Sequence, residues 1–188
     1  MRSDRNKRYS ENVSGADNQQ ERLDGYISGF VDGEGCFAVA VNRNPSCRSG
    51  YQLVPEFHVS QNGDRAQVLH VIRRRFGGCG YIKSNGRKDR ALVYVVRRRD
   101  DLVRHVIPFF ERSPLLSSKH EDFEKFAAIV RSMTLGHHRT SDGFARLLDE
   151  ALSMNGGGRF RNVRWKEVIR SSPDSSETIR RTQRVMPL

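Results

Sequence analysis

The stretch LDGYISGFVDGEGCF, residues 23–37, places glycine where a helix should avoid it. Residues 23–33 have the apolar spacing of a helix, and the residues after them begin the alternation of a strand. Gly25, Gly29 and Gly33 recur at every fourth position, although each interior glycine costs a helix about 1 kcal/mol relative to alanine. The stretch therefore predicts a helix with a face of small residues, followed directly by a strand.

The two sides of this predicted helix differ in character. One side carries large apolar side chains, as a core-facing stripe does: Leu23, Tyr26, Ile27, Phe30 and Val31. The other side carries small and acidic residues: Gly25, Ser28, Gly29, Asp32 and Gly33. Small residues at this spacing let a second backbone approach closely. Since the chain has one such helix, we expect the same helix of a second copy across a two-fold axis, and tight packing within one chain is the alternative. The predicted interface consists of Gly25, Ser28, Gly29 and Asp32.

Two acids end this helix. A two-fold axis would bring together two copies of Asp32 and of Glu34, which repel one another unless cations lie between them. Mg²⁺ suits such a place because it takes one or two carboxylates together with phosphate oxygens and water. Metal held in this way between basic strands is suited to phosphodiester hydrolysis. The alternative, that both acids cap the helix, is weak because a helix C-terminus disfavours negative charge.

The chain is strongly basic. Its 188 residues suffice for one domain with a sizeable core, and 33 lysines and arginines against 22 acids give a net charge of +11. Most of the cations are arginine, whose planar fork binds phosphates and base edges. This balance favours a nucleic-acid partner, although a structural ribonucleoprotein component would share it.

Nothing in the sequence directs the chain to a membrane or to export. Cys36, Cys47 and Cys79 lack metal-ligand spacing and fit a reducing compartment. No apolar run approaches the ~20 residues that span a bilayer, and the N-terminus lacks an apolar signal core. We expect a cytoplasmic protein, associated with a bacterial nucleoid, or an organellar one, rather than a secreted or membrane protein.

The remaining pattern predicts a polar, disordered arm over residues 1–20, a domain over 21–172 and a flexible basic tail over 173–188. Within the domain we expect strands at 36–42 and 52–60, a helix at 64–76, and a hairpin at 80–96 that turns at Asn85–Gly86. Pro55 suggests a bulge or an unpaired position. Helices follow near 100–110, 118–133 and 141–154, the second opening on a capping box of Ser118 and Glu121, and a short last helix holds Trp165. The fold class is α+β: an α-β-β-α-β-β-α core with a curved antiparallel sheet, plus extra C-terminal helices.

One face of this sheet has a composition suited to DNA. Alternation and the hairpin turn place the following residues on it: Ala38, Ala40, Asn42, Asn44, Gln52, Val54, Glu56, His58, Tyr81, Lys83, Asn85, Arg87, Lys88, Arg90 and Leu92. Glu56 is the single acid among them, whereas arginines at 73–75 and 97–99 are placed at element ends for phosphate contacts. Such a face fits a major groove, although any solvated sheet face is polar.

The motif LDGYISGFVDGEG resembles the LAGLIDADG motif of homing endonucleases, in the single-motif, homodimeric branch. Further segments resemble that family in the same order, over residues 22–170: FHVSQNGDRAQVLHVIRRRFG, GGCGYIKS, LLSSKHEDFEKF and ALSMNGGGRFR. The resemblance implies that Glu34 is the metal-binding acid, here Glu where Asp is commoner, and that the Gly33 carbonyl contacts the metal. It also implies that Gln61, Arg65 and Lys119 lie near the scissile phosphate. From the residues alone, Gln61 and Arg65 could share one phosphate or simply be solvated, and Lys119 could lie on a wet helix face.

We therefore predict a homodimeric endonuclease that cuts double-stranded DNA at a long, nearly palindromic site, with Mg²⁺ as cofactor and Mn²⁺ able to replace it. By resemblance, the cut crosses the minor groove and leaves short 3′ overhangs, and genes of this kind commonly lie in self-splicing introns. The rival interpretation is a non-cleaving nucleic-acid-binding protein of the same fold, either an intron RNA maturase or a DNA-binding regulator.

Overall fold

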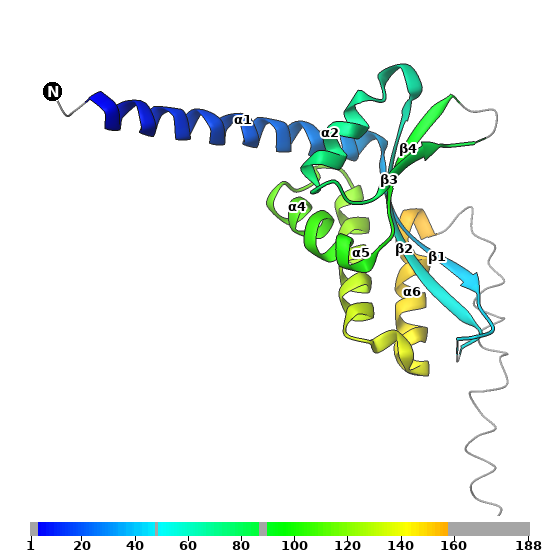
Figure 1. Ribbon diagram of the computed structural model, residues 1–188. Helices are drawn as coiled ribbons and strands as arrows, with labels where there is room; N and C mark the ends of the chain where they lie inside the picture. The colour runs from blue at the N-terminus through cyan, green and yellow to red at the C-terminus, as the bar shows by residue number, and fades with distance from the viewer. Residues whose placement is uncertain (1–3, 48, 87–89, 158–188) are drawn as a thin grey trace, which may run out of the picture.

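A computed structural model describes residues 4–47, 49–86 and 90–157 of the chain, with backbone alone over residues 4–16. The element order confirms the predicted α+β core (Figure 1). It runs α1 (Asp4–Glu34), β1 (Gly35–Arg43), β2 (Tyr51–Asn62), η1 (Gly63–Arg65), α2 (Gln67–Arg75), β3 (Tyr81–Ser84) and β4 (Ala91–Val96). The C-terminal helices are α3 (Arg99–Asp101), η2 (Leu102–Val106), α4 (Ile107–Arg112), α5 (Lys119–Thr134), η3 (His137–Arg139) and α6 (Ser141–Gly157).

The four strands form one antiparallel sheet in the order β1-β2-β4-β3. β1 pairs with β2 in an unbroken register from Gly35 opposite Val59 to Arg43 opposite Tyr51, so the bulge considered at Pro55 is absent. β4 pairs with β2 only from Phe57 onward. Pro55 therefore lies where one edge of β2 has no described strand beside it, and its missing N–H interrupts no ladder there.

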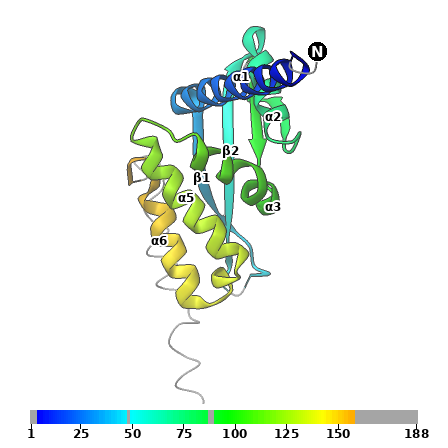
Figure 2. The ribbon, with the colours of Figure 1, turned by 90° about the vertical axis from the view of Figure 1, so that its left-hand side faces the viewer.

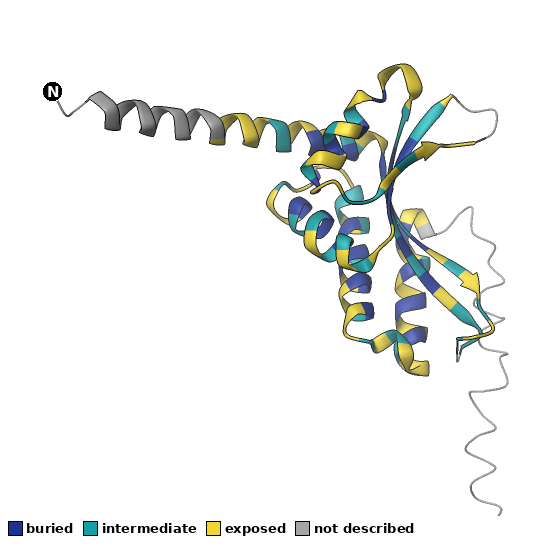
Figure 3. Cartoon of the chain, viewed as in Figure 1, coloured by how far each residue is buried: buried dark blue, intermediate teal, exposed yellow. Residues whose placement is uncertain are grey.

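The helices cover one face of the sheet, and the core lies between (Figure 2). Phe37, from the opening stretch, lies at its centre, with ring centroids 5.2 to 5.4 Å from those of Phe57, Phe110, Phe123 and Phe126. Buried residues follow the side of the sheet that faces α4, α5 and α6 (Figure 3). The opposite face of the sheet remains uncovered by any described helix, which leaves it available to a ligand.

The junction between α1 and β1 requires the last glycine of the opening stretch. A Cβ on Gly35 would lie 2.5 Å from Cγ1 of Val31 and 2.8 Å from its carbonyl oxygen, so a side chain would collide there. Near the same junction, at the end of α6, Asn155 adopts a left-handed conformation, with φ of 53°. Its side-chain Nδ2 donates to the Phe37 carbonyl (3.0 Å), and its backbone N–H donates to Asp122 (2.7 Å). β1 is thereby held at both its helix junction and the end of α6.

The N-terminal prediction is wrong for the described residues. The structure continues α1 back to Asp4, so residues 4–20 are helical rather than a disordered arm. No proline interrupts residues 4–34, and a helix already nucleated by the packed residues near 23–34 extends at little cost. The predicted last helix with Trp165 and the basic tail at 173–188 lie outside the described residues.

The start of α5 also differs in detail from its prediction. Ser118 occupies the N-cap position without a side-chain cap hydrogen bond, so the expected capping box with Glu121 does not form. The preceding serine acts instead, because the Ser117 hydroxyl accepts a hydrogen bond from the Lys119 backbone N–H (3.1 Å). Within the described ranges, no helix is both long and apolar enough to span a membrane.

Candidate active site and nucleic-acid interface

The C-terminal end of α1 carries the predicted metal-binding acid in an open position. Gly33 and Glu34 are both exposed, and the Glu34 carboxylate makes no hydrogen bond or ion pair with any described residue. Lys119, predicted to lie nearby, does so: its Nζ donates to the Val31 carbonyl at 3.0 Å. This carbonyl belongs to the last turn of α1, where backbone acceptors lack helical partners and a cation is favourable. A free carboxylate and a fixed ammonium therefore share one helix end.

The Asp32 carboxylate, which the sequence analysis predicts to face a second helix, binds the loop before α5 of its own chain. Its carboxylate accepts hydrogen bonds from the backbone N–H groups of Leu116 (3.1 Å) and Ser117 (2.9 Å), and from the Ser117 hydroxyl. Partial burial raises the pKa of Asp32, but these hydrogen bonds and the charge of Lys119 outweigh it and lower the pKa below the usual value. Asp32 is thus an ionised anchor for the loop before α5.

The Ser28 side chain likewise makes its hydrogen bonds within the chain. It is buried, and its hydroxyl donates to the carbonyls of Ser113 and Pro114, each at 3.0 Å. Ser28 and Asp32 therefore make their hydrogen bonds to loops of their own chain, because a small polar residue satisfies nearby loop groups as readily as it admits another helix. Their place in a dimer face stays a prediction. Tyr26, predicted for the core, is 57% exposed.

Gly25, Gly29 and Gly33 form the outer stripe of α1. All three are exposed, and a Cβ added at any of them would meet nothing described within 4 Å. The side chains of Tyr26 and Phe30, stacked with ring centroids 6.3 Å apart, lie alongside this stripe. The part of the predicted interface that faces outward thus consists of Gly25 and Gly29 without Ser28 and Asp32.

Ser117 is a residue that sequence reasoning missed. Its hydroxyl donates to Asp32 and accepts from the Lys119 N–H, so it connects the end of α1 to the first turn of α5. The only signal in the sequence is the pair Ser117–Ser118, in which the capping pattern selects the second serine. The loop conformation that selects the first is set by Asp32, far away in the chain.

Gln61 and Arg65 lie at the predicted strand-to-helix junction, at the same end of the sheet as Glu34. Gly35 pairs with Val59, so Gln61 lies two residues further along β2 toward that end. The Gln61 side chain accepts a hydrogen bond from the Asn62 N–H (2.7 Å), and Arg65 is exposed beside Asp64, with Nε 3.8 Å from the carboxylate. The structure thus places both residues at the Glu34 end of the sheet, and neither makes a described hydrogen bond or ion pair with Glu34 or Lys119.

The uncovered sheet face includes most of the predicted DNA-facing residues. The register of β1 and β2 places these on it: Cys36, Ala38, Ala40, Asn42, Gln52, Val54, Glu56 and His58. Asn44, just beyond β1, joins them through a hydrogen bond from its Nδ2 to Gln52 (3.1 Å). Tyr81 and Lys83 follow on β3, with the Lys83 ammonium 5.9 Å from the Tyr81 ring centroid. Asn85 continues their alternation, and Arg87 and Lys88 lie outside the described residues.

The prediction for β4 places its side chains on the wrong faces of the sheet. A two-residue turn at Asn85–Gly86 would pair Tyr81 with Arg90 and Lys83 with Lys88, so that Arg90 and Leu92 would share the face of Tyr81 and Lys83. The observed loop is longer, because the Asn85 N–H donates to the Ala91 carbonyl (2.9 Å), and Lys83 pairs with Val93. An odd shift in register turns every side chain to the other face. Leu92 therefore packs against the core, Arg90 precedes the strand, and Val93 and Val95 take their places, 5% and 1% exposed.

The single acid on this face is neutralised. Glu56 accepts a hydrogen bond from Arg97 and lies 3.2 Å from Nδ1 of His58. Burial lowers the pKa of His58 and outweighs the opposing influence of Glu56, so His58 is neutral near pH 7. Two other predicted phosphate contacts are engaged elsewhere: Arg75 is paired with Asp24, and Arg99 donates to the Met133 carbonyl (2.8 Å).

Comparison with known proteins agrees with this geometry. A family model described as LAGLIDADG endonuclease matches residues 27–130, more than half of the chain. The chain belongs to the LAGLIDADG endonuclease family. The homing endonuclease I-TnaI has a similar structure at 40% identity, with a TM-score of 0.71 over 78% of this chain and 97% of that one. The I-LtrWI homing endonuclease bound to target DNA matches at 31% identity, with a TM-score of 0.73 over 79% of this chain and 48% of that one.

Two curated relatives from Neurospora crassa are much longer than this LAGLIDADG chain. Probable intron-encoded endonuclease 2 of Neurospora crassa is 32% identical over 70% of this chain, which corresponds to 29% of that protein. The chain similarly spans 24% of probable intron-encoded endonuclease 3 of the same fungus.

One LAGLIDADG chain offers only part of a metal site. Across the described residues, no three His, Cys, Asp or Glu side chains gather where they could hold an ion. Asp32 is occupied by Ser117, so the donors at the end of α1 are the Glu34 carboxylate and the exposed carbonyl of Gly33. This small oxygen set fits Mg²⁺, which binds through one or two carboxylates and retains water and phosphate oxygens as further ligands. The residues therefore fit the ion, provided that DNA or a second chain completes its shell.

Proposed function

We propose that the protein is a homodimeric, Mg²⁺-dependent endonuclease that cuts double-stranded DNA at a long, nearly palindromic site, as an intron-homing enzyme does. Mn²⁺ is expected to replace Mg²⁺. A DNA substrate places the protein with a genome, either in the bacterial cytoplasm at the nucleoid or in an organelle.

The observation that carries this proposal is the Glu34 carboxylate, which has no described partner at the helix end where Lys119 binds the Val31 carbonyl. Two half-buried acids of this basic chain, Asp24 and Glu56, are paired with the arginines Arg75 and Arg97. Glu34 instead ends α1 in the open, where it can hold a divalent ion against a phosphate. A protein that only bound nucleic acid would gain nothing from this charge, because an isolated carboxylate repels phosphate.

The uncovered sheet face supports the choice of DNA as substrate. Its polar side chains lie on paired antiparallel strands, an arrangement that fits a major groove, and its single acid is neutralised by Arg97. The outer stripe of α1 supports the dimer, because its three glycines leave room for a second helix. A dimer with one sheet per subunit would read two half-sites related by the same two-fold axis.

The residues at the end of α1 have distinct proposed roles. Mg²⁺, when bound, supplies a Lewis acid that activates water and stabilises charge on the leaving 3′ oxygen. Glu34 and the Gly33 carbonyl hold the ion, one Glu34 coming from each subunit. Lys119, fixed on the Val31 carbonyl, adds positive charge where the phosphate becomes more negative. Gln61 and Arg65, at the same end of the sheet, position the phosphate.

Glu34→Gln tests the proposal directly. A plasmid library of random sites, digested with Mg²⁺ and sequenced at the cut ends, first identifies a target duplex. The variant keeps size and hydrogen bonding but loses the charge that holds metal. We expect cleavage of this duplex to fall by at least about 1,000-fold with Mg²⁺ or Mn²⁺. Affinity without metal, measured by gel shift, should be unchanged or tighter.

Glu21→Gln is the matched control, since it changes an exposed acid on the same helix. It should cut at the wild-type rate. Cleavage by Glu34→Gln at the wild-type rate would exclude Glu34 as the ligand. A wild-type protein that binds one sequence tightly but cuts nothing in the library would instead identify a non-cleaving regulator or maturase of the same fold.

A further inference from the structure

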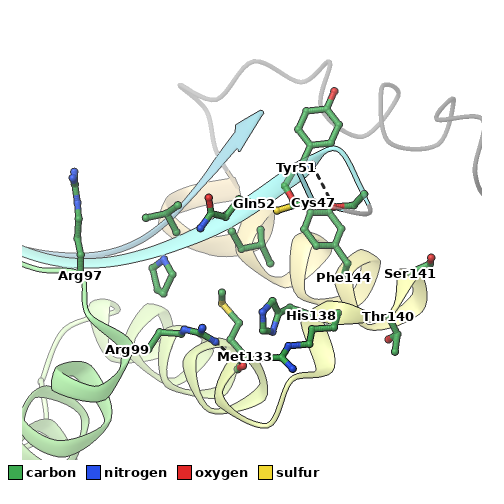
Figure 4. Close-up of a pocket in the computed structure, with 15 residues that line it drawn as sticks. Cys47, Tyr51, Gln52, Arg97, Arg99, Met133, His138, Thr140, Ser141 and Phe144 are labelled. Atoms are coloured by element: carbon green, nitrogen blue, oxygen red, sulfur yellow. Dashed lines mark hydrogen bonds between the residues drawn. The ribbon is translucent and has the colours of Figure 1, made fainter. Parts of the chain in front are cut away.

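A cavity of about 410 Å³ lies at the opposite end of the sheet from Glu34 (Figure 4). Tyr51 to Pro55 of β2 line one wall, at the edge that β4 leaves unpaired. The other wall comes from the end of α5, η3 and the first turn of α6. Since Tyr51 pairs with Arg43, at the far end of β1 from Glu34, the cavity is separate from the proposed cleavage site.

The charge of this cavity is one-sided. Its lining contains Arg97, Arg99, Arg139 and His138, and no aspartate or glutamate among the described residues. Arg97 is paired with Glu56, and Arg99 donates one N–H to the Met133 carbonyl (2.8 Å), which leaves its other guanidinium N–H groups without a described partner. Arg139 is exposed and forms no ion pair within the described chain. Nδ1 of His138 is buried without a described hydrogen-bond partner. Burial, followed by the charges of Arg99 and Arg139, lowers the pKa of His138 and outweighs a backbone hydrogen bond to Met133 that raises it.

Apolar and aromatic side chains from both walls complete the lining of the cavity. Leu53, Met133 and Phe144 are buried there, and Tyr51 is half-buried. Tyr51 of β2 and Phe144 of α6 lie together at one end of the cavity, away from Arg99 (Figure 4). An anion that fits must therefore have a flat apolar part as well as its charge.

We propose that this cavity binds a nucleotide, with the phosphate against Arg99, Arg139 and His138 and the base against Phe144 and Tyr51. A volume of about 410 Å³ lies in the range of small-ligand sites, ~300–1,000 Å³. Two arginine forks match a phosphate monoester, whereas inorganic phosphate would leave the aromatic wall uncovered. The nucleotide can be free or the phosphorylated end of a nucleic-acid strand, since both present the same chemistry.

Calorimetric titration of the full chain tests the site, with AMP as probe and with adenosine and inorganic phosphate as its separated parts. We expect one AMP per chain, and at least tenfold weaker binding of adenosine and of phosphate. Arg139→Gln should weaken AMP binding at least tenfold. Arg146→Gln, the matched control, removes an exposed arginine of α6 that does not line the cavity and should change the affinity less than twofold.

Three results would overturn the proposal: no saturable binding of millimolar AMP, binding of phosphate as tight as that of AMP, or equal effects of the two substitutions. Thermal unfolding of the Arg139→Gln and Arg146→Gln variants is the folding control. Unchanged midpoints would show that their AMP affinities do not reflect a folding defect. A 5′-phosphorylated trinucleotide then distinguishes the sources, because tighter binding than AMP identifies a strand end and weaker binding a free nucleotide. A protein that fails to cut DNA would still bind AMP, so the two proposals fail independently.

Discussion

Two stripes of residues run along α1, one position apart, and they have opposite surroundings. The inner stripe, Asp24, Ser28 and Asp32, is bound in turn to Arg75, to the Ser113 and Pro114 carbonyls, and to Leu116 and Ser117. The outer stripe, Gly25, Gly29 and Gly33, has nothing described within 4 Å of where its side chains would begin. Both stripes repeat every four residues, so spacing alone cannot separate them.

The difference shows what each stripe contributes. The polar side chains of the inner stripe make their hydrogen bonds within the chain. These bonds fix α1 to α2, to the loop after α4 and to the start of α5. Its effects should appear in the stability of one chain and in the placement of Lys119. The outer stripe adds nothing to the monomer and even weakens the helix, so any benefit must come from contact with another molecule.

Gly29→Leu should have the largest effect and acts on the outer stripe alone. A leucine would fill the space that a second helix needs, and we expect a monomer by light scattering. Cleavage of the target duplex should fall by about 100-fold or more, because each chain supplies one Glu34. The unfolding free energy of the monomer should not fall, since the new side chain meets no described atom.

Leu152→Ala shows what a general folding defect looks like, because Leu152 packs against the core and lies far along the chain from α1. It should lower the thermal midpoint while the folded fraction still dimerises. A Gly29→Leu protein that remains dimeric and cuts normally would remove the outer stripe from function. It would also favour the interpretation that its glycines serve the single chain.

Asp24→Asn acts on the inner stripe and should have the largest effect on stability. Asp24 accepts two hydrogen bonds from Arg75, both 2.6 Å, and the pair is mostly buried. Loss of this charge-assisted pair should lower the unfolding free energy by about 1–3 kcal/mol at pH 7. Chemical denaturation measures it, and cleavage by the folded fraction should be unchanged.

The pH dependence of this effect has a definite sign. Burial raises the pKa of Asp24, but the hydrogen bonds from Arg75 and Gln20 outweigh it and lower the pKa below the ordinary 3.8. A carboxyl whose pKa is lowered by folding stabilises the protein above its unfolded-state pKa and loses this effect as pH falls through the folded-state value. The gap between wild type and Asp24→Asn should therefore narrow below about pH 4. A gap that stays constant down to pH 2 would contradict the ion pair.

The predictability of these features follows from how local their causes are. The strands and most helices were predictable because alternation and helical spacing are written within each segment. The face of β4 was not, because it depends on the length of the loop after Asn85, and a single odd shift reverses it. The inner stripe was not predictable either, because the partners of Ser28 and Asp32 lie some 85 residues away, in a loop without a pattern of its own. The placement of Glu34 at the end of α1 was predictable, because the helical spacing stops there within the segment itself.

Ser117→Ala examines whether the inner stripe reaches the proposed active site. The hydroxyl connects Asp32 to the Lys119 N–H, so its loss should leave Lys119 less well fixed. We expect the cleavage rate to fall about tenfold with target affinity unchanged, because positioning acts in the transition state. Ser117→Thr, which keeps the hydroxyl, should restore the rate.

The control is the adjacent Ser118→Ala, which removes a hydroxyl without a cap hydrogen bond and should cut at the wild-type rate. A double-mutant cycle separates positioning from general damage. If Ser117 acts through Lys119, then Ser117→Ala should have no further effect in a Lys119→Met background. Additive losses in the double variant would show that Ser117 acts by another route.

The smallest effects are expected from alanine substitutions at the neighbouring residues Ser28 and Gly29. They compare the two stripes most directly, because the residues are adjacent in the chain. Ser28→Ala removes a buried donor from two carbonyls but gains helix propensity, so the unfolding free energy should fall by only about 0.5–1.5 kcal/mol. Gly29→Ala adds a methyl group to open space and should raise it by up to about 1 kcal/mol, measured at concentrations where the chain is monomeric. The two substitutions should rank the other way in their effect on dimerisation. Gly29→Ala should weaken association by keeping the helices apart, whereas Ser28→Ala should leave association unchanged. If both substitutions shifted stability in the same direction and left association equal, the two stripes would not differ in the way that their contacts indicate.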